Sequence, residues 1–286
     1  MKRLTILIVA LLALGGCSAA LSAPEAPPQS RRPMRIVSLD YCADQYVLKL
    51  VDRERILALS PDAASDFSYM REAAEGLPSV RPRAEDVLVL QPDLVVMSYG
   101  GGPNAQAFFE RAGVPVVNIG WVNDLDAVMS NMERIANELG EGERGRQASA
   151  EMRARVERLS TSVRTQSDGP TAMYMTPAGV TTGPGTLVHE MLAAAGFQNF
   201  EQVPGWRSIP LETLAYSHPD VIAAAYFDSW AAHPDAWSPM KHPVARAQLS
   251  ERQVVPLRGA WTTCHGWFLM DAIEALADAR EDFSAQ

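Results

Sequence analysis

The side chains with the richest chemistry lie in short loops that follow predicted buried strands. The loop at 259–267 (GAWTTCHGW) places Trp261, Cys264 and His265 directly after the apolar run at 254–257. Aromatic rings and soft side chains in one loop favour contact with a large, flat or partly apolar ligand. Cys264 and His265 match no zinc spacing, so we expect no metal site of the protein's own.

A second group of candidates follows strands in the first half of the chain. Tyr41 and Cys42 come after the apolar run at 35–39 and before a helix predicted at Gln45–Val51. Asp40 would either border a ligand or cap that helix. In open parallel sheets, the loops after strands border the ligand crevice. In the second half of the chain, 181–186 and the segment around Trp206 are also predicted as loops. The further candidates in the loops of the first half are Phe67, Tyr69, Tyr99 and Gly100. The aromatic ones would either stack on a ligand or cover the core.

The cysteines Cys42 and Cys264 lie in opposite halves of the chain. In an exported protein, two cysteines could form one disulfide, which here would tie the two halves together. Two free thiols beside a ligand cleft are the alternative, and the sequence leaves both open.

An internal repeat predicts the elements that position these loops. A Glu followed seven positions later by Pro-Asp and a short apolar run occurs at Glu85 and, 127 residues later, at Glu212. Each copy predicts a short helix that ends before the proline, and then a buried strand at Leu94–Met97 or Val221–Ala225. Two matching units far apart predict an α/β protein of two similar, Rossmann-like lobes with parallel sheets and a ligand cleft between them.

A charged helix is predicted between the two lobes, because Glu143–Val163 carries apolar residues at helical spacing. A single long helix in this position would act as a strut that limits how far the lobes close. The predicted order is a signal peptide, a tether, an N-terminal lobe, a connecting helix and a C-terminal lobe: 1–17, 18–33, 34–140, 141–166 and 167–286.

The first residues read as a targeting segment. Lys2 and Arg3 precede an apolar run at Leu4–Leu14, which is too short to span a bilayer. The Leu-Gly-Gly-Cys sequence that ends at Cys17 resembles a bacterial lipoprotein cleavage box and predicts a lipid on Cys17. A plain secretory signal is the alternative. The Pro- and Ala-rich stretch that follows is typical of a tether.

The charge of the chain excludes one class of partner. The full sequence has a net charge of −9, and removal of Lys2 and Arg3 with the signal leaves 23 of the 25 basic residues against 34 acidic ones, or −11. Such an acidic surface argues against nucleic acid. No later segment is apolar and long enough to cross a membrane. We expect a monomer.

Several motifs carry a resemblance to a known family. PDLVVMSYGG, GVPVV and TTGPGTLVHEMLAAAGFQN are the most specific, with SDFSY and VPGW in support. Across roughly residues 34–282 the chain resembles the bacterial periplasmic binding proteins that serve ABC importers of cobalamin, iron–siderophore and haem, and it is most similar to the cobalamin-binding members. The resemblance implies two α/β lobes joined by one long helix.

The resemblance also implies roles for named residues. The family's two docking glutamates, which engage arginines of the membrane permease, map to Glu85 and Glu212. Its cleft aromatics map to Phe67 or Tyr69, Trp206 and Trp261, which should then border one hollow. The thiols and the Ser98-Tyr99 pair before the glycines depart from the cobalamin-binding pattern, where Trp-Arg stands before the glycines.

The function implied is a lipid-anchored, periplasmic receptor that is not an enzyme. It would bind a metal chelate such as cobalamin as its cargo, need no cofactor, and deliver the cargo to an ABC permease dimer with its ATPase. Haem or a ferric siderophore is the alternative cargo, with Tyr41, Tyr69 or His265 near the iron. An enzyme using Cys42 and Cys264 is a third reading, but the chain has no Gly-x-Ser-x-Gly elbow and no zinc-protease motif.

Overall fold

The computed structural model describes residues 32–162, 169–227 and 238–284. Cys17, the predicted signal peptide, nearly all of the tether and the last residues of the predicted connecting helix lie outside this part. Residues 32–286 form one compact unit.

A parallel sheet of four strands in the order β2-β1-β3-β4 forms the N-terminal lobe. Its strands are short and mostly buried, as expected when helices cover both faces of a parallel sheet. The elements are β1 (Ile36–Ser38), α1 (Tyr41–Leu50), η1 (Arg53–Arg55), β2 (Ile56–Ala58), α2 (Ala84–Val89), β3 (Leu94–Met97), α3 (Ala105–Arg111) and β4 (Val116–Asn118).

The C-terminal lobe repeats this topology. Its parallel sheet has the order β10-β9-β5-β7, which is the N-terminal order when its strands are numbered within the lobe. A small antiparallel pair, β6 with β8, is added beside it. The elements are β5 (Thr171–Met175), β6 (Val180–Thr182), α6 (Leu187–Ala194), β7 (Gln198–Asn199), β8 (Trp206–Ser208), α7 (Leu211–Leu214), β9 (Val221–Tyr226), η2 (Pro239–Lys241), α9 (Pro243–Glu251), β10 (Gln253–Arg258), η3 (Gly259–Trp261) and α10 (Leu269–Ser284).

The sequence repeat is confirmed as a structural repeat. In both lobes the Glu helix, α2 or α7, leads into the third strand of the sheet, β3 or β9. The aspartate of each Pro-Asp pair then binds the start of the neighbouring first strand. Asp93 accepts hydrogen bonds from the backbone N–H groups of Met34 and Arg35, and Asp220 accepts one from that of Thr171.

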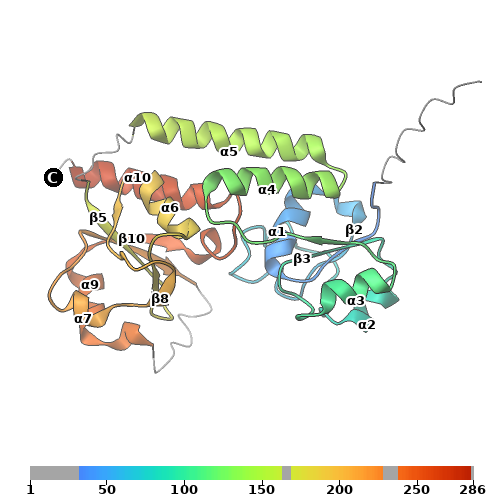
Figure 1. Ribbon diagram of the computed structural model, residues 1–286, viewed down its shortest axis with the longest axis horizontal. Coiled ribbons are helices and arrows are strands. Elements are labelled where there is room, and N and C mark those ends of the chain that lie inside the picture. Colours follow the sequence, from blue (N-terminus) through green and yellow to red (C-terminus); the bar gives the residue numbers. More distant parts are fainter. Residues whose placement is uncertain (1–31, 163–168, 228–237, 285–286) are drawn as a thin grey trace, which may run out of the picture. The chain divides into compact units, whose positions relative to one another are not determined.

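Two helices, α4 (Leu125–Glu138) and α5 (Gly142–Ser162), connect the lobes. They reverse direction at Gly140, whose φ of +73° suits glycine, and pack along each other (Figure 1). The α5 helix also contacts α6 and α10 of the second lobe, where Arg155 pairs with Asp271 and Glu274. The long helix predicted between the lobes is therefore present as α5, with α4 packed alongside it.

Two local predictions were wrong. The first helix begins at Tyr41, not at Gln45, because Asp40 caps it by accepting the backbone N–H of Ala43. Trp206 and the segment from Thr181, both predicted as loop, belong instead to the paired strands β8 and β6. A three-residue strand leaves too short an alternation for its period to be recognised.

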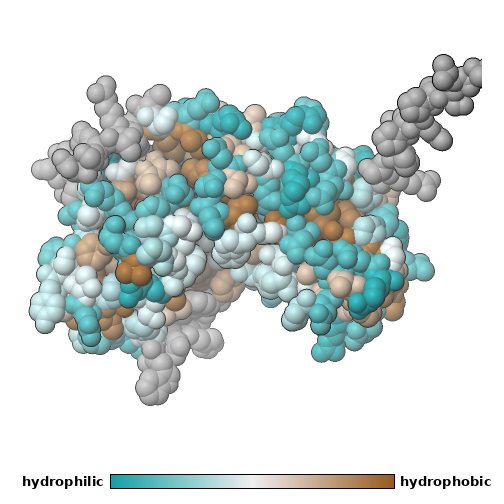
Figure 2. Space-filling view, in the orientation of Figure 1, coloured by the Kyte–Doolittle hydropathy of each residue, from teal (hydrophilic) through white to brown (hydrophobic). Residues whose placement is uncertain are grey.

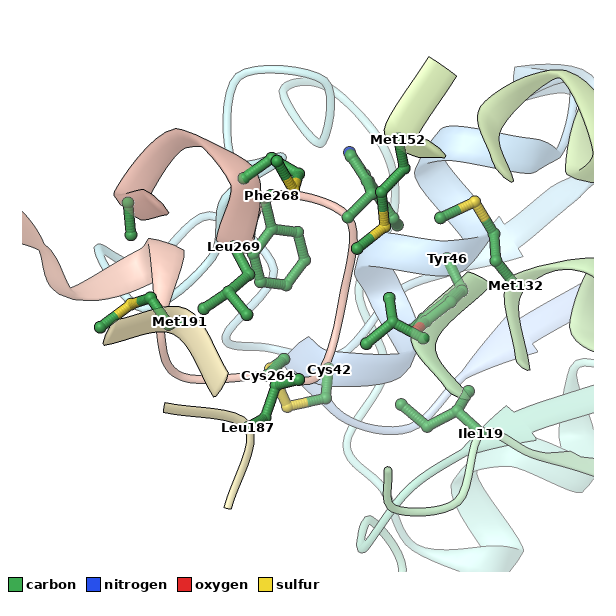
Figure 3. Packing of buried hydrophobic residues seen from close by; sticks show 14 of the residues in the cluster. Cys42, Tyr46, Ile119, Met132, Met152, Leu187, Met191, Cys264, Phe268 and Leu269 are labelled. Carbon is green, nitrogen blue, oxygen red and sulfur yellow. A yellow bond between two sulfur atoms is a disulfide. The ribbon is translucent and has the colours of Figure 1, made fainter. Parts of the chain in front are cut away.

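The largest buried cluster extends from one lobe into the other. Figure 3 shows part of it, with Tyr46 of α1 and Phe268 near the Cys42–Cys264 disulfide. The face of the molecule in Figure 2 is mostly hydrophilic, with apolar residues in small scattered groups. Among the described residues, no helix combines the length and apolar character that a membrane span requires.

Candidate ligand-binding site

Asp40 organises the carboxyl edge of the first sheet. It follows β1 at the point where the chain order reverses between β1 and β3, which is the usual ligand crevice of such sheets. Its side chain is buried and accepts four backbone N–H groups. Oδ1 accepts that of Ala43 (2.9 Å), and Oδ2 accepts those of Ser98, Tyr99 and Gly100 (2.7, 3.1 and 2.9 Å). One carboxylate therefore fixes the loops after both strands.

Tyr41 and Tyr99 lie side by side because Asp40 holds both loops. Their rings meet edge to face with centroids 5.9 Å apart, and Tyr99 is 56% exposed. Burial raises the pKa of Tyr41, so its phenol is a neutral hydrogen-bonding group at physiological pH. Gly100 itself is buried, and a Cβ there would collide with the backbone carbonyl of Leu39. The structure thus gives Gly100 a packing role.

Aromatic stacking joins the two lobes beside these tyrosines. Phe67, from the loop after β2, stacks on Phe227 at the end of β9 with centroids 4.8 Å apart. The backbone carbonyl of Phe67 also accepts the Thr263 hydroxyl at 3.1 Å. Tyr69 stacks on Phe268 and donates its hydroxyl to Asp271 (2.8 Å). Phe67 and Tyr69, both predicted as ligand contacts, therefore hold the lobes together.

The two cysteines form a disulfide. Cys42 in the first turn of α1 is bonded to Cys264, with Cα atoms 5.5 Å apart, and both residues are buried. The sequence allowed either a disulfide or two free thiols. The structure shows the disulfide, so the prediction of two free thiols is wrong. A buried disulfide between the lobes supports the cleft without offering a thiol to a ligand.

His265 makes a second contact between the lobes. Its ring lies 3.6 Å from that of Trp121 (centroid to centroid), which follows β4, and its backbone carbonyl accepts the Tyr46 hydroxyl at 2.5 Å. Burial lowers the pKa of His265 to about 4. The imidazole is therefore neutral at physiological pH and able to act as a donor or a ligand atom.

This shift predicts a pH dependence of stability. In the unfolded chain His265 has an ordinary imidazole pKa, whereas in the folded chain its pKa is about 4. Between these two pKa values the unfolded chain binds the proton more tightly than the folded chain does. The free energy of unfolding should therefore fall as the pH drops through this window. Asp44, whose pKa burial raises to about 6, acts in the opposite direction, because its folded form is the one that takes up a proton.

Comparison of variants isolates the histidine from Asp44. Urea unfolding of the His265→Gln variant between about pH 7 and pH 5 should show a smaller acid destabilisation than the parent chain. His218→Gln, which changes an exposed histidine of the second lobe, should leave the acid destabilisation unchanged. If the free energy of unfolding falls equally with pH in His265→Gln and in the parent chain, the lowered pKa of His265 is contradicted.

Three of the cavities that the described residues line lie at the lobe boundary. They separate two tryptophans that we expected to share one hollow. Trp206 borders a water-sized cavity with Trp121 and His265. Trp261 instead borders a cavity of about 290 Å³ with Tyr69. The third, of about 140 Å³, lies against Tyr226 and Phe227. A drug-sized ligand needs roughly 300–1,000 Å³, so the largest of these three cavities is at the lower limit for such a ligand.

Water-exposed aromatic rings mark the strand ends of both lobes. Four of the exposed large apolar residues are of this kind. They are Tyr99 after β3, Trp121 after β4, Trp206 on β8 and Tyr226 at the end of β9. Large rings left in water at a cleft can stack on a flat ligand without rearranging the core.

Three of the functional candidates escaped the sequence analysis. Trp121 follows a strand and Tyr226 ends one. Their positions at strand ends could have identified them from the sequence. Arg258 ends β10, lines the two larger cavities together with Arg71, and lies 6.0 Å from the ring of Trp261. Within the described residues, neither arginine forms an ion pair. Both are thus available to an acidic group of a ligand. The described part of the chain holds no cluster of three His, Cys, Asp or Glu residues that could bind a metal ion.

Glu85 and Glu212 occupy equivalent and exposed positions. Each lies in the first turn of its helix, α2 or α7. Figure 1 shows both helices on the side away from α4 and α5. Two carboxylates at a fixed separation on one side of the molecule could orient a basic partner.

Two lobes of the same topology, a helical connection between them and exposed aromatic rings at the strand ends of both are typical of a two-lobed solute-binding protein. The chain belongs to the periplasmic binding protein family, whose sequence profile matches residues 36–227. A cobalamin-binding protein of Halobacterium salinarum is 26% identical over 221 residues, which cover 72% of this chain. The matched part is 58% of that relative's length.

Solved structures share the fold. The periplasmic haem-binding protein RhuT of Roseiflexus sp. RS-1 has a TM-score of 0.67 at 24% identity, covering 86% of this chain and 98% of that one. The vitamin B12-binding protein BtuF of Vibrio cholerae has a TM-score of 0.66 at 21% identity, covering 89% and 99%. The family and the fold confirm the predicted class and the two-lobed α/β architecture.

Proposed function

We propose that this chain is the solute-binding component of an ABC importer and that its cargo is a corrinoid of the cobalamin type. The observation that carries the proposal is the set of exposed rings at the strand ends of both lobes, Tyr99, Trp121, Trp206 and Tyr226. A corrin ring presents a broad flat surface to such side chains. The similarity to the cobalamin-binding protein of Halobacterium salinarum supports the choice of cargo.

Equilibrium titration followed by tryptophan fluorescence tests the cargo. Cyanocobalamin should quench the emission saturably, and Trp121→Ala and Trp206→Ala should each weaken binding about tenfold or more, as buried aromatic anchors do. Phe108→Ala, which removes an exposed ring on α3 away from the strand ends, is the matched control and should leave the affinity unchanged. Failure of cyanocobalamin, haemin and ferrichrome to bind would overturn the proposal.

Haem or a ferric siderophore is a second candidate cargo, which Arg71 and Arg258 favour. Both guanidinium groups line the two larger cavities, where they could meet the acidic groups of such a chelate. His265, Tyr41 or Tyr69 could then contact the iron. On this alternative, Arg258→Gln weakens haemin binding, and His265→Ala or Tyr41→Phe changes the absorbance of bound haemin. Cyanocobalamin binding should not respond to Arg258→Gln.

Delivery of the cargo would use Glu85 and Glu212. Their carboxylates would enter two basic sockets of the permease, which sets the orientation of docking. Attachment to the membrane would use a lipid on Cys17, with the chain held at the periplasmic surface. A Cys17→Ser variant should then leave the membrane fraction and appear in the soluble periplasmic fraction.

A further inference from the structure

Val89 and Tyr216 are the most exposed large apolar residues of the described chain. Their side chains are 80% and 93% exposed, respectively. A single exposed apolar residue is ordinary on a protein surface and carries no meaning alone. These two, however, each follow a docking glutamate by four positions, Val89 after Glu85 and Tyr216 after Glu212.

The structural repeat makes the two positions equivalent. Within each unit, the residue midway between the glutamate and the apolar residue is buried, Val87 in one lobe and Leu214 in the other. The aspartate four positions after the exposed residue binds the adjacent first strand in both lobes. The helix and the start of the following strand are thus fixed to the lobe in the same way.

The acid and the apolar side chain share one helical face in each lobe. Residues four apart are neighbours on a helix surface, so Glu85 and Val89 of α2 lie together. In the second lobe the turn continues past α7, because the backbone N–H groups of Tyr216 and Ser217 both bind the carbonyl of Thr213. Tyr216 therefore lies one turn beyond Glu212.

The two carboxylates are available to a partner. Within the described residues, neither Glu85 nor Glu212 forms an ion pair or a side-chain hydrogen bond. The nearby Arg81 pairs with Asp86 instead. A carboxylate without an ion-pair partner, beside an apolar side chain, would fit a partner surface on which a basic group borders an apolar recess.

We propose that Val89 and Tyr216 are the apolar half of the permease-docking surface, so that each lobe makes a two-point contact. The glutamate orients the lobe, and the apolar side chain contributes buried area at the same socket. The partner then presents two similar sockets, each with a basic group beside an apolar recess. This inference rests on the proposed importer function.

Charge argues against the other occupants of this surface. In a two-fold dimer through this surface, Glu85 and Glu212 would lie against the same surface of the second copy, and the chain already has a net charge of −9. An anionic lipid surface would repel the same carboxylates. A basic protein surface is the partner that both halves of the contact fit.

The test measures binding of the full chain to the ABC permease–ATPase complexes of the same organism, each reconstituted in nanodiscs. Val89→Ser and Tyr216→Ser should each raise Kd about tenfold, the scale of an interface anchor, with cyanocobalamin affinity and circular dichroism unchanged. Glu85→Gln with Glu212→Gln should weaken binding and flatten its salt dependence. Val203→Ser is the matched control, because Val203 is exposed but has Asn199 four positions before it.

The outcomes separate the two proposals. Unchanged Kd for Val89→Ser and Tyr216→Ser, with binding still weakened by the glutamate variants, overturns the two-point contact and leaves the importer function standing. Absence of binding by the parent chain overturns both. A change in the sedimentation coefficient of Val89→Ser or Tyr216→Ser would assign the surface to self-association and overturn the inference.

Discussion

Replacement of Asp40 by alanine should cost about 4 kcal/mol of the free energy of unfolding, because it leaves several buried donors without their acceptor. The carboxylate accepts four backbone N–H groups from two loops and is only 3% exposed. Urea unfolding followed by circular dichroism measures the loss. Asp40→Asn keeps one acceptor oxygen and should lose less.

A matched control distinguishes this role from ordinary helix capping. Asp124 caps α4 by accepting the backbone N–H of Ala127 alone, and it is exposed. Asp124→Ala should therefore cost about 1 kcal/mol, the usual value for a cap. If Asp40→Ala costs no more than Asp124→Ala, the contacts with residues 98–100 carry no weight.

The same substitution should also weaken ligand binding. Asp40 sets the positions of Tyr41 and Tyr99, which we propose as ligand contacts, so a variant that still folds would present them in a looser arrangement. Asp124 caps α4 and forms no hydrogen bond with the loops that carry these tyrosines, so its substitution should weaken binding less. Titration with cyanocobalamin under conditions where both variants remain folded makes the comparison.

Removal of the disulfide is the second change with a large expected effect. The bridge joins residues 222 apart in the sequence, and closing so long a loop restricts the unfolded chain strongly. The double variant Cys42→Ser with Cys264→Ser should lose about 4 kcal/mol, which corresponds to a fall in Tm of roughly 10 °C for a chain of this size.

Reduction provides the control for this prediction. Dithiothreitol should lower the Tm of the parent chain to nearly that of the double variant, and it should not change the Tm of the double variant at all. The bridge lies in the buried cluster that spans the lobes (Figure 3), so serine hydroxyls there add a small desolvation cost. Equal stability of the oxidised parent and the double variant would contradict the prediction.

The repeat explains why so much of the fold could be predicted. Glu85 and Glu212 begin two copies of one helix–strand unit. An apolar run such as Leu94–Met97 is readily recognised as a buried parallel strand. The strand order was not predicted, because a repeated helix–strand unit does not say which strands of a sheet are neighbours. The first turn of α1 was missed because Asp40 serves both as a cap and as a loop residue.

The site was harder to predict because it depends on which strand ends meet. Trp206 and Trp261 both follow the expected pattern of a ring near a strand end, yet they border separate cavities. Trp121 was passed over although it follows β4 in the same way. Whether Cys42 and Cys264 meet depends on how the lobes pack, and spacing along the chain contains no information about that packing.

The position of the bridge sets an order on the maturation of the protein. Cys42 lies near the start of the first lobe, and Cys264 follows it by 222 residues, after the last strand of the second lobe. The first lobe can therefore complete its sheet during synthesis, but its cysteine cannot pair until residue 264 has been made. A chain truncated before that point, or kept in a reducing compartment, would remain unlocked and exposed to proteases.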